Sequence, residues 1–183
     1  VTEAGTYRFS GTLTNGQVVV QAPDKSVVKL VSDGVTISNS TGCAINVVNA
    51  GVAVVILADG SKNQLSDASS YVYPDVTTTE PDAALFSTEG LTITGAGSLS
   101  VKGNAKDGIA SKDGIVIDSG TITVDAADDG IRGKDYLVIN GGTTTVNAKA
   151  DGLKATNDVD ATLGYVAVTN GNLSVTASHD GIS

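Results

Sequence analysis

Short runs of apolar and β-branched residues recur along the whole chain, and glycine, asparagine or aspartate separates them. Within a run, apolar and polar residues alternate, as in Thr121-Ile122-Thr123-Val124 and Asn172-Leu173-Ser174-Val175. Alternation with a period of two is typical of a β-strand with one buried face, and the separating residues are typical of tight turns. No segment shows a sustained helical period. The pattern therefore predicts an all-β chain of many short strands.

One phrase, Asp-Gly followed by Ile or Leu, occurs four times in the C-terminal half. The copies begin at Asp107, Asp129, Asp151 and Asp180, with two steps of 22 residues and a last step of 29. Each unit of about 22 residues contains three strand candidates, and repeats of this length are typical of stacked repeat architectures. We therefore predict a single-stranded right-handed parallel β-helix, a β-solenoid with about 22 residues and three strands per coil.

The prediction treats residues 1–183 as a single β-helix domain with two interruptions. Residues 66–82 form an inserted loop that contains prolines, tyrosines and acidic residues, and residues 158–164 form an inserted turn. Because terminal repeats are normally capped, we expect a further coil or cap beyond Ser183. A β-sandwich or jelly roll is the alternative fold, but it would not require residue identity at a 22-residue step.

Charge and cysteine content narrow the classes of partner. Eleven Lys and Arg residues stand against 20 Asp and Glu residues, which gives a net charge of −9. This balance argues against nucleic acid, because phosphate binding rests on basic patches. Cys43 is the only cysteine, so an internal disulfide is excluded, and its apolar surroundings indicate a buried and inert thiol. The chain contains no run of about 18 apolar residues, so the sequence predicts no membrane-spanning segment. We also expect the protein to be a monomer.

Stacking would place the repeated acidic residues of adjacent coils about 4.8 Å apart. Unit charges at that distance repel one another by about 1 kcal/mol even in water. Bound Ca²⁺ would relieve the repulsion, because clustered carboxylate and amide oxygens suit calcium better than zinc or copper. Flanking lysines, or an aspartate turn ladder that only satisfies backbone donors, are the alternatives. The predicted calcium ligands are Asp107, Asp113, Asp129, Asp135, Asp151, Asn157, Asp158, Asp160 and Asp180.

Four segments of the chain resemble a known family of bacterial secreted carbohydrate-binding β-helix proteins. The segments are residues 81–87, 106–115, 126–135 and 150–158. The resemblance covers most of the chain and implies a pectate-lyase-like fold with calcium at the acidic turns. It also implies a secreted or cell-surface bacterial protein whose ligand is plant cell-wall polysaccharide, such as polygalacturonate or cellulose. Catalysis is not an established property of this family.

The leading hypothesis is therefore a calcium-dependent carbohydrate-binding module, in which bound calcium offers open coordination positions to uronate carboxylates. The predicted ligand-binding residues are Lys112, Arg132, Lys134, Lys154 and Tyr136. A calcium-dependent polysaccharide lyase, with Arg132 or Lys134 as the base, is the second hypothesis. An ice-binding surface or a surface adhesin is a further alternative, because Thr and Ser recur in rows. We expect His179 to be an ordinary surface residue.

Overall fold

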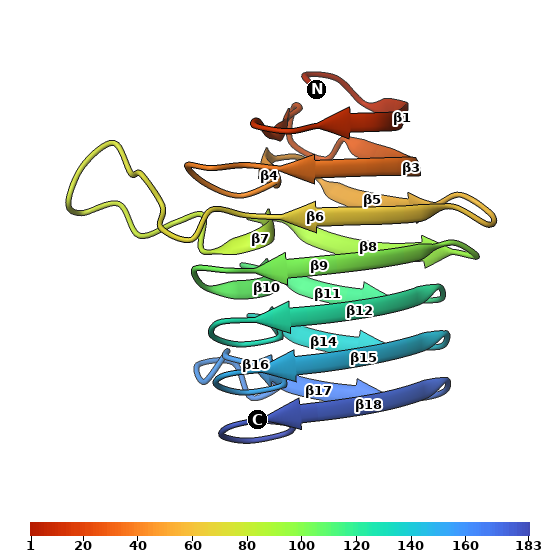
Figure 1. Ribbon diagram of the computed structural model, residues 1–183. Coiled ribbons are helices and arrows are strands. Elements are labelled where there is room, and N and C mark those ends of the chain that lie inside the picture. Colours follow the sequence, from red (N-terminus) through yellow and green to blue (C-terminus); the bar gives the residue numbers. More distant parts are fainter.

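The computed structural model describes residues 1–183 and contains strands but no helix (Figure 1). The strands are β1 (Gly5–Leu13), β2 (Val18–Gln21), β3 (Val27–Ser38), β4 (Ile45–Asn49), β5 (Val52–Leu57), β6 (Lys62–Ser66), β7 (Ala83–Ser87), β8 (Gly90–Gly95), β9 (Ser98–Gly103), β10 (Asp107–Ser111), β11 (Gly114–Ile117), β12 (Thr121–Ala126), β13 (Ile131–Gly133), β14 (Tyr136–Ile139), β15 (Thr143–Ala148), β16 (Leu153–Ala155), β17 (Tyr165–Val168) and β18 (Asn172–Ala177). The structure contains no helix of the length and apolarity that a membrane crossing needs.

All named strand pairs are parallel, and the strands form two sheets. The 12-stranded sheet has the order β17-β14-β11-β8-β5-β3-β6-β9-β12-β15-β18, with β1 beside β3. The six-stranded sheet has the order β16-β13-β10-β7-β4-β2. From the red N-terminus to the blue C-terminus, successive circuits of the chain lie one below another (Figure 1). One circuit here means one passage through the six-stranded sheet and both arms of the 12-stranded sheet.

The long strand β3 shows why the predicted fold needs correction. Its first half pairs with β5 and its second half with β6, so two rows of strands join into one curled sheet. The strand bends at Gly34, whose φ of 71° suits glycine. The backbone N–H groups of Gly34 and Val35 both donate to the side-chain oxygen of Asn63, at 3.0 Å each. The prediction of one single-stranded right-handed β-helix is therefore wrong: the structure has a curled parallel sheet and a second parallel sheet.

Apolar side chains from both sheets form one core that runs along the stack. Ile109, Ile131 and Leu153 are register neighbours in the six-stranded sheet, and all three are fully buried. Full burial of one such side chain contributes about 1.5–3 kcal/mol. The 22-residue step of the sequence thus identifies correctly which residues become neighbours in space. Cys43 is buried as predicted, and burial raises its pKa to about 12, so the thiol stays protonated.

Residues 67–82 contain no strand and extend from the stack as a loop between β6 and β7 (Figure 1). Near its start the loop is fixed by Asp67, whose Oδ2 accepts a hydrogen bond of 2.8 Å from the Tyr71 hydroxyl. Near its end, Glu80 and Pro81 lie beside Phe86 of β7. Phe86 is buried although it lies outside the main core. The end of the loop therefore lies against the outer face of the six-stranded sheet.

Candidate functional site

The four aspartates of the Asp-Gly phrases form a row, with one residue in each circuit. The backbone N–H of Asp129 donates to Oδ1 of Asp107 at 3.1 Å, and the next two circuits repeat this bond. The repeats join Asp151 to Asp129 at 3.0 Å and Asp180 to Asp151 at 3.1 Å. Asp107, Asp129 and Asp151 are only 3%, 6% and 7% exposed. The row has the geometry of a turn ladder that satisfies backbone donors between circuits.

Lys154 neutralises the middle of this row. Its Nζ lies 3.0 Å from Oδ2 of Asp129 and 2.8 Å from Oδ2 of Asp151. The hydrogen bond from Lys154 is the main cause that lowers the pKa of Asp151 below its ordinary value. In both Asp129 and Asp151, one carboxylate oxygen accepts a hydrogen bond from a backbone N–H, and the other pairs with the Lys154 ammonium group.

Arg132 joins the aspartate row to the end of the 67–82 loop. Its Nε donates to Oδ2 of Asp107 at 2.6 Å, and its Nη2 donates to Oδ2 of Asp82 at 2.7 Å. Burial raises the pKa of Asp107 to about 7, although the Arg132 charge acts in the opposite direction. Burial also raises the pKa of Asp82, whose Oδ1 is buried without a hydrogen-bond partner. A buried carboxylate, Asp107, and a half-buried one, Asp82, thus share one guanidinium, which favours protonation of one of them.

We expect the free energy of unfolding to rise as the pH is lowered from about 8 to about 5. The folded pKa of Asp107, about 7, lies above its ordinary value of 3.8, so the folded state holds a proton that the unfolded state releases. This stabilisation is complete when the pH is below the ordinary pKa of Asp107, and it is lost as the pH rises through the pKa of the folded state. Asp107→Asn keeps the acceptor for Asp129 but cannot titrate, so urea denaturation should show a flatter pH dependence. An unchanged pH dependence in this variant would contradict the assignment.

A second acidic row lies six residues further along each circuit, at Glu89, Asp113 and Asp135, and Asn157 continues it. The backbone N–H of Asp135 donates to the carbonyl of Asp113 at 3.2 Å, and Nδ2 of Asn157 donates to Oδ1 of Asp135 at 2.7 Å. Oδ1 of Asp113 accepts the N–H of Gly114 at 2.9 Å. These acidic residues are half-buried, and none of them takes part in an ion pair. This row, unlike the buried one, keeps carboxylate oxygens without a cationic partner.

Tyr136 and Tyr165 are stacked beside the second row. They begin β14 and β17 and are register neighbours, with ring centroids 5.8 Å apart and ring planes inclined by 21°. Burial is the main cause that raises the pKa of Tyr136, and the charges of Asp113, Tyr165 and Asp135 add to it. Tyr165 is 45% exposed. We call Asp113, Asp135, Tyr136 and Tyr165 the tyrosine–aspartate corner.

A family model described as "Carbohydrate-binding domain-containing protein" matches residues 1–183. The chain belongs to this carbohydrate-binding family. A curated protein of Acetivibrio thermocellus with the same description is 37% identical over 126 residues, which are 69% of this chain and 44% of that protein. The chain thus spans less than half the length of this relative. A solved structure described as a polysaccharide lyase-like protein from C. thermocellum, gadolinium derivative, aligns with a TM-score of 0.95 and 31% identity. The alignment covers 100% of this chain and 83% of that one.

These comparisons confirm the expected membership of a carbohydrate-binding family. The family description agrees with a binding domain that is not an enzyme. The structural relative is described as polysaccharide lyase-like, which agrees with the second hypothesis, a lyase.

The predicted calcium ligands of this carbohydrate-binding domain do not converge on one point. The structure contains no group of three or more His, Cys, Asp or Glu side chains placed to hold a metal ion. The buried row does not fit a cation, because Arg132 and Lys154 already occupy its outer oxygens. On the inserted turn, Asp158 and Asp160 are exposed, and Oδ1 of Asp160 accepts bonds from Thr162. The second row fits a cation only if ligand oxygens and water complete its coordination.

The predicted ligand-binding residues also separate into two groups. Arg132 and Lys154 are largely committed to carboxylates of the buried row, and Lys112 pairs with Glu80 at 2.7 Å. Lys134 is exposed and makes no ion pair, and Tyr136 belongs to the tyrosine–aspartate corner. His179 is exposed, as predicted.

The sequence analysis missed two residues of these sites. Tyr165 follows Tyr136 by 29 residues, the same step that separates Asp151 from Asp180, so the repeat contained the signal that pairs the two rings. Asp82 lies in the loop outside the repeat, and its contact with Arg132 spans 50 residues. No local pattern indicates that contact.

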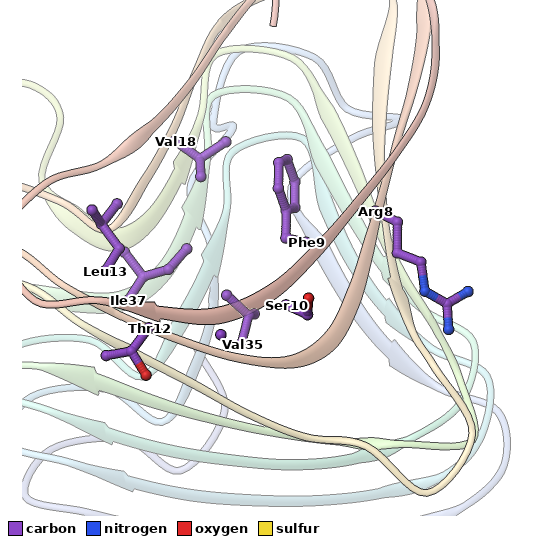
Figure 2. Close-up of a pocket in the computed structure, with 9 residues that line it drawn as sticks. Arg8, Phe9, Ser10, Thr12, Leu13, Val18, Val35 and Ile37 are labelled. Carbon is purple, nitrogen blue, oxygen red and sulfur yellow. The ribbon is translucent and has the colours of Figure 1, made fainter.

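A hollow of about 330 Å³ lies at the N-terminal end of the core. Its apolar lining includes Phe9, Leu13 and Val18, which Figure 2 shows grouped together. Arg8 points away from this group and pairs with Asp33 at 2.8 Å (Figure 2). Ser10 and Thr12 also line the hollow, and its grouped apolar side chains give it the character of the end of the core.

The rows of Thr and Ser behind the ice-binding alternative are present in register on β9, β12 and β15. Ser98, Thr121 and Thr143 form one such row. Asp125 and Asn147 are neighbours on the same strands and are joined by a hydrogen bond of 3.0 Å. An ice-binding role of this surface stays a prediction.

Proposed function

We propose that this domain binds acidic plant cell-wall polysaccharide of the polygalacturonate type at the tyrosine–aspartate corner, and that it does not cleave the polymer. The observation that carries the proposal is the pair Asp113 and Asp135. They lie in adjacent circuits, have no ion-pair partner, and directly precede Gly114 and Tyr136, the register neighbours where the Tyr136 ring lies over the backbone. Membership of a carbohydrate-binding family supports a sugar polymer as the partner.

Calcium dependence follows from charge. A protein with a net charge of −9 repels a uronate polymer, and two further carboxylates at the contact strengthen that repulsion. Asp113 and Asp135 would hold the Ca²⁺, which supplies positive charge and open coordination positions for uronate oxygens. The same proposal places the domain outside a bacterial cell, as a monomer.

The contacts of Arg132 favour binding over lyase chemistry. A lyase needs a base that is neutral before it takes the proton from the uronate. Burial lowers the pKa of Arg132, but the charges of Asp107 and Asp82 outweigh this effect and raise it above its ordinary value. Arg132 therefore stays protonated and joins the loop to the sheet. Lys154 is protonated for the same reason, because its hydrogen bond to Asp151 raises its pKa.

Affinity electrophoresis in gels that contain polygalacturonate tests the proposal. We expect calcium to retard the protein and a chelator to abolish the retardation. Asp113→Asn combined with Asp135→Asn should weaken the calcium-dependent affinity about tenfold or more, which corresponds to at least about 1.4 kcal/mol.

Asp118→Asn combined with Asp125→Asn is the matched control. It removes the same charge from two exposed residues, and each of them also accepts a bond from an asparagine of the next circuit, at 2.9 and 3.0 Å. Equal loss of affinity in both double variants, or retardation that persists in chelator, would refute calcium bridging at this corner.

A further inference from the structure

We propose that Asn170 is a site of spontaneous covalent modification, at which the side-chain amide is lost to water and the residue becomes aspartate or isoaspartate. The site is the dipeptide Asn170-Gly171 in the turn between β17 and β18. The proposal goes beyond polysaccharide binding and does not depend on it, because the reaction needs only this turn and water.

The reaction passes through a cyclic imide. The backbone nitrogen of Gly171 attacks the side-chain carbon Cγ of Asn170 and loses its proton, while the bond from Cγ to Nδ2 breaks and ammonia leaves. Water then opens the imide at either of its carbonyl groups. One opening gives aspartate. The other gives isoaspartate, in which the main chain passes through the former side-chain carbon.

The structure places the reacting groups together. The N–H of Gly171 donates to Oδ1 of Asn170 at 2.8 Å, so the side-chain carbonyl group lies against the nitrogen that attacks it. The same N–H makes no hydrogen bond to another backbone group. Nδ2 of Asn170, which leaves as ammonia, has no hydrogen-bond partner in the protein. Both residues are exposed, so water reaches them.

The fold requires the glycine that makes this dipeptide reactive. Gly171 has a φ of 95°, and an added Cβ would lie 2.7 Å from the carbonyl oxygen of Gly142. Gly120 and Gly142 take the same place before the corresponding strands of the two preceding circuits. Ser119 and Gly141 precede those glycines, so only the circuit of β18 combines the turn glycine with an asparagine. Because glycine carries no side chain, its nitrogen is open to attack.

Two other Asn-Gly dipeptides, at Asn15 and Asn140, are exposed but have amides that are held by neighbouring circuits. Oδ1 of Asn15 accepts bonds from the N–H and the hydroxyl of Ser40, at 3.0 and 2.8 Å. Nδ2 of Asn140 donates to Oδ1 of Asp118 at 2.9 Å, and Oδ1 of Asn140 accepts a bond of 3.0 Å from the Thr169 hydroxyl. These bonds have to break before either amide can react, so Asn170 should react first.

The product changes the start of β18. The new carboxyl group, with an ordinary pKa of about 3.9, is ionised at neutral pH and makes the net charge of −9 more negative by one unit. Directly after the turn, the N–H of Asn172 donates to the carbonyl of Gly142 at 2.9 Å. Isoaspartate therefore inserts an extra main-chain atom at the point where β18 joins the sheet.

Peptide mapping of the folded protein, after incubation in mildly alkaline buffer, tests the inference. Trypsin places Asn15, Asn140 and Asn170 in separate peptides, residues 9–25, 135–149 and 155–183. Mass spectrometry detects the conversion of amide to acid, and fragmentation locates it within each peptide. We expect Asn170 to convert at least about tenfold faster than the other two, which corresponds to about 1.4 kcal/mol of activation free energy. Equal rates at the three asparagines, or conversion of Asn140 before Asn170, would overturn the inference.

Incubation in urea is the control for the role of the fold. Unfolding frees the amides of Asn15 and Asn140, so the three rates should converge. An advantage of Asn170 that is as large in urea as in buffer would show that the local sequence alone, and not the structure of the turn, selects this residue.

Asp118→Ala tests the protection from the opposite direction in folded protein. This variant removes the acceptor for Nδ2 of Asn140, so it should raise the rate at Asn140 severalfold and leave the rate at Asn170 unchanged. A rate at Asn140 that stays as low as in the wild type would contradict the claim that hydrogen bonds between circuits decide which asparagine reacts.

Discussion

Replacing Arg132 with alanine is expected to lower the free energy of unfolding by about 3–5 kcal/mol at pH 8. The guanidinium is 19% exposed and bonds two carboxylates, so its loss leaves the buried carboxylate of Asp107 and the half-buried carboxylate of Asp82 without a cationic partner. The end of the 67–82 loop also loses its bond to the six-stranded sheet. Urea denaturation of the variant measures the change. At pH 5 the loss should be smaller, because protonation removes the unpaired charge.

Arg8→Ala is the control for this prediction. Arg8 also bonds an aspartate, Asp33, at 2.8 Å, but the two side chains are 66% and 37% exposed. Exposed pairs of this kind contribute at most about 1 kcal/mol. A similar small effect at both arginines would show that the Arg132 bridge adds nothing beyond a surface ion pair.

The second large effect is expected at Gly130, where alanine should cost about 3 kcal/mol of unfolding free energy. An added Cβ would overlap Cγ1 of Val146 and approach the carbonyl of Gly152 in the next circuit. The Gly152 carbonyl accepts the N–H of Ile131 at 3.0 Å, so any shift also disturbs the bonds between circuits. Thermal or urea denaturation measures the loss.

Gly181→Ala tests the same substitution in the fourth copy of the phrase. A Cβ at Gly181 meets no atom within 4 Å, so the change should stay within about 0.5 kcal/mol. The two variants share their local sequence, Asp-Gly-Ile, and differ in the circuit that packs against them. Equal losses would mean that intrinsic chain preferences, and not packing between circuits, explain the repeated glycine.

The repeat predicts which residues of adjacent circuits are neighbours, but it does not predict where one strand ends and the next begins. A step of 22 residues pairs Ile109 with Ile131 correctly, because parallel stacking converts sequence period directly into register. In the sequence, residues 27–30 and 35–37 are two apolar runs with Asp33 and Gly34 between them, a pattern that favours two separate strands. The structure joins them in β3, because the side chain of Asn63 bonds both N–H groups at the bend. That bond comes from a residue in the next circuit, so no local pattern shows it.

The candidate site was predictable in part for the same reason. Both acidic rows follow from the repeat, but residue types alone do not tell which row is neutralised. Lys112, Arg132 and Lys154 all flank acidic turns, and only the structure shows Arg132 and Lys154 reaching into the buried row. Once these ion pairs are assigned, Asp113 and Asp135 are seen to have carboxylates without a cationic partner.

The most direct test of the account is a crystal structure of the protein with calcium and a short oligogalacturonide. We predict an ion in contact with Asp113 and Asp135, a uronate oxygen completing its coordination, and a sugar ring against Tyr165. An oligosaccharide bound over Arg132 and Lys154, with the tyrosine–aspartate corner free of both ion and sugar, would contradict the central claim.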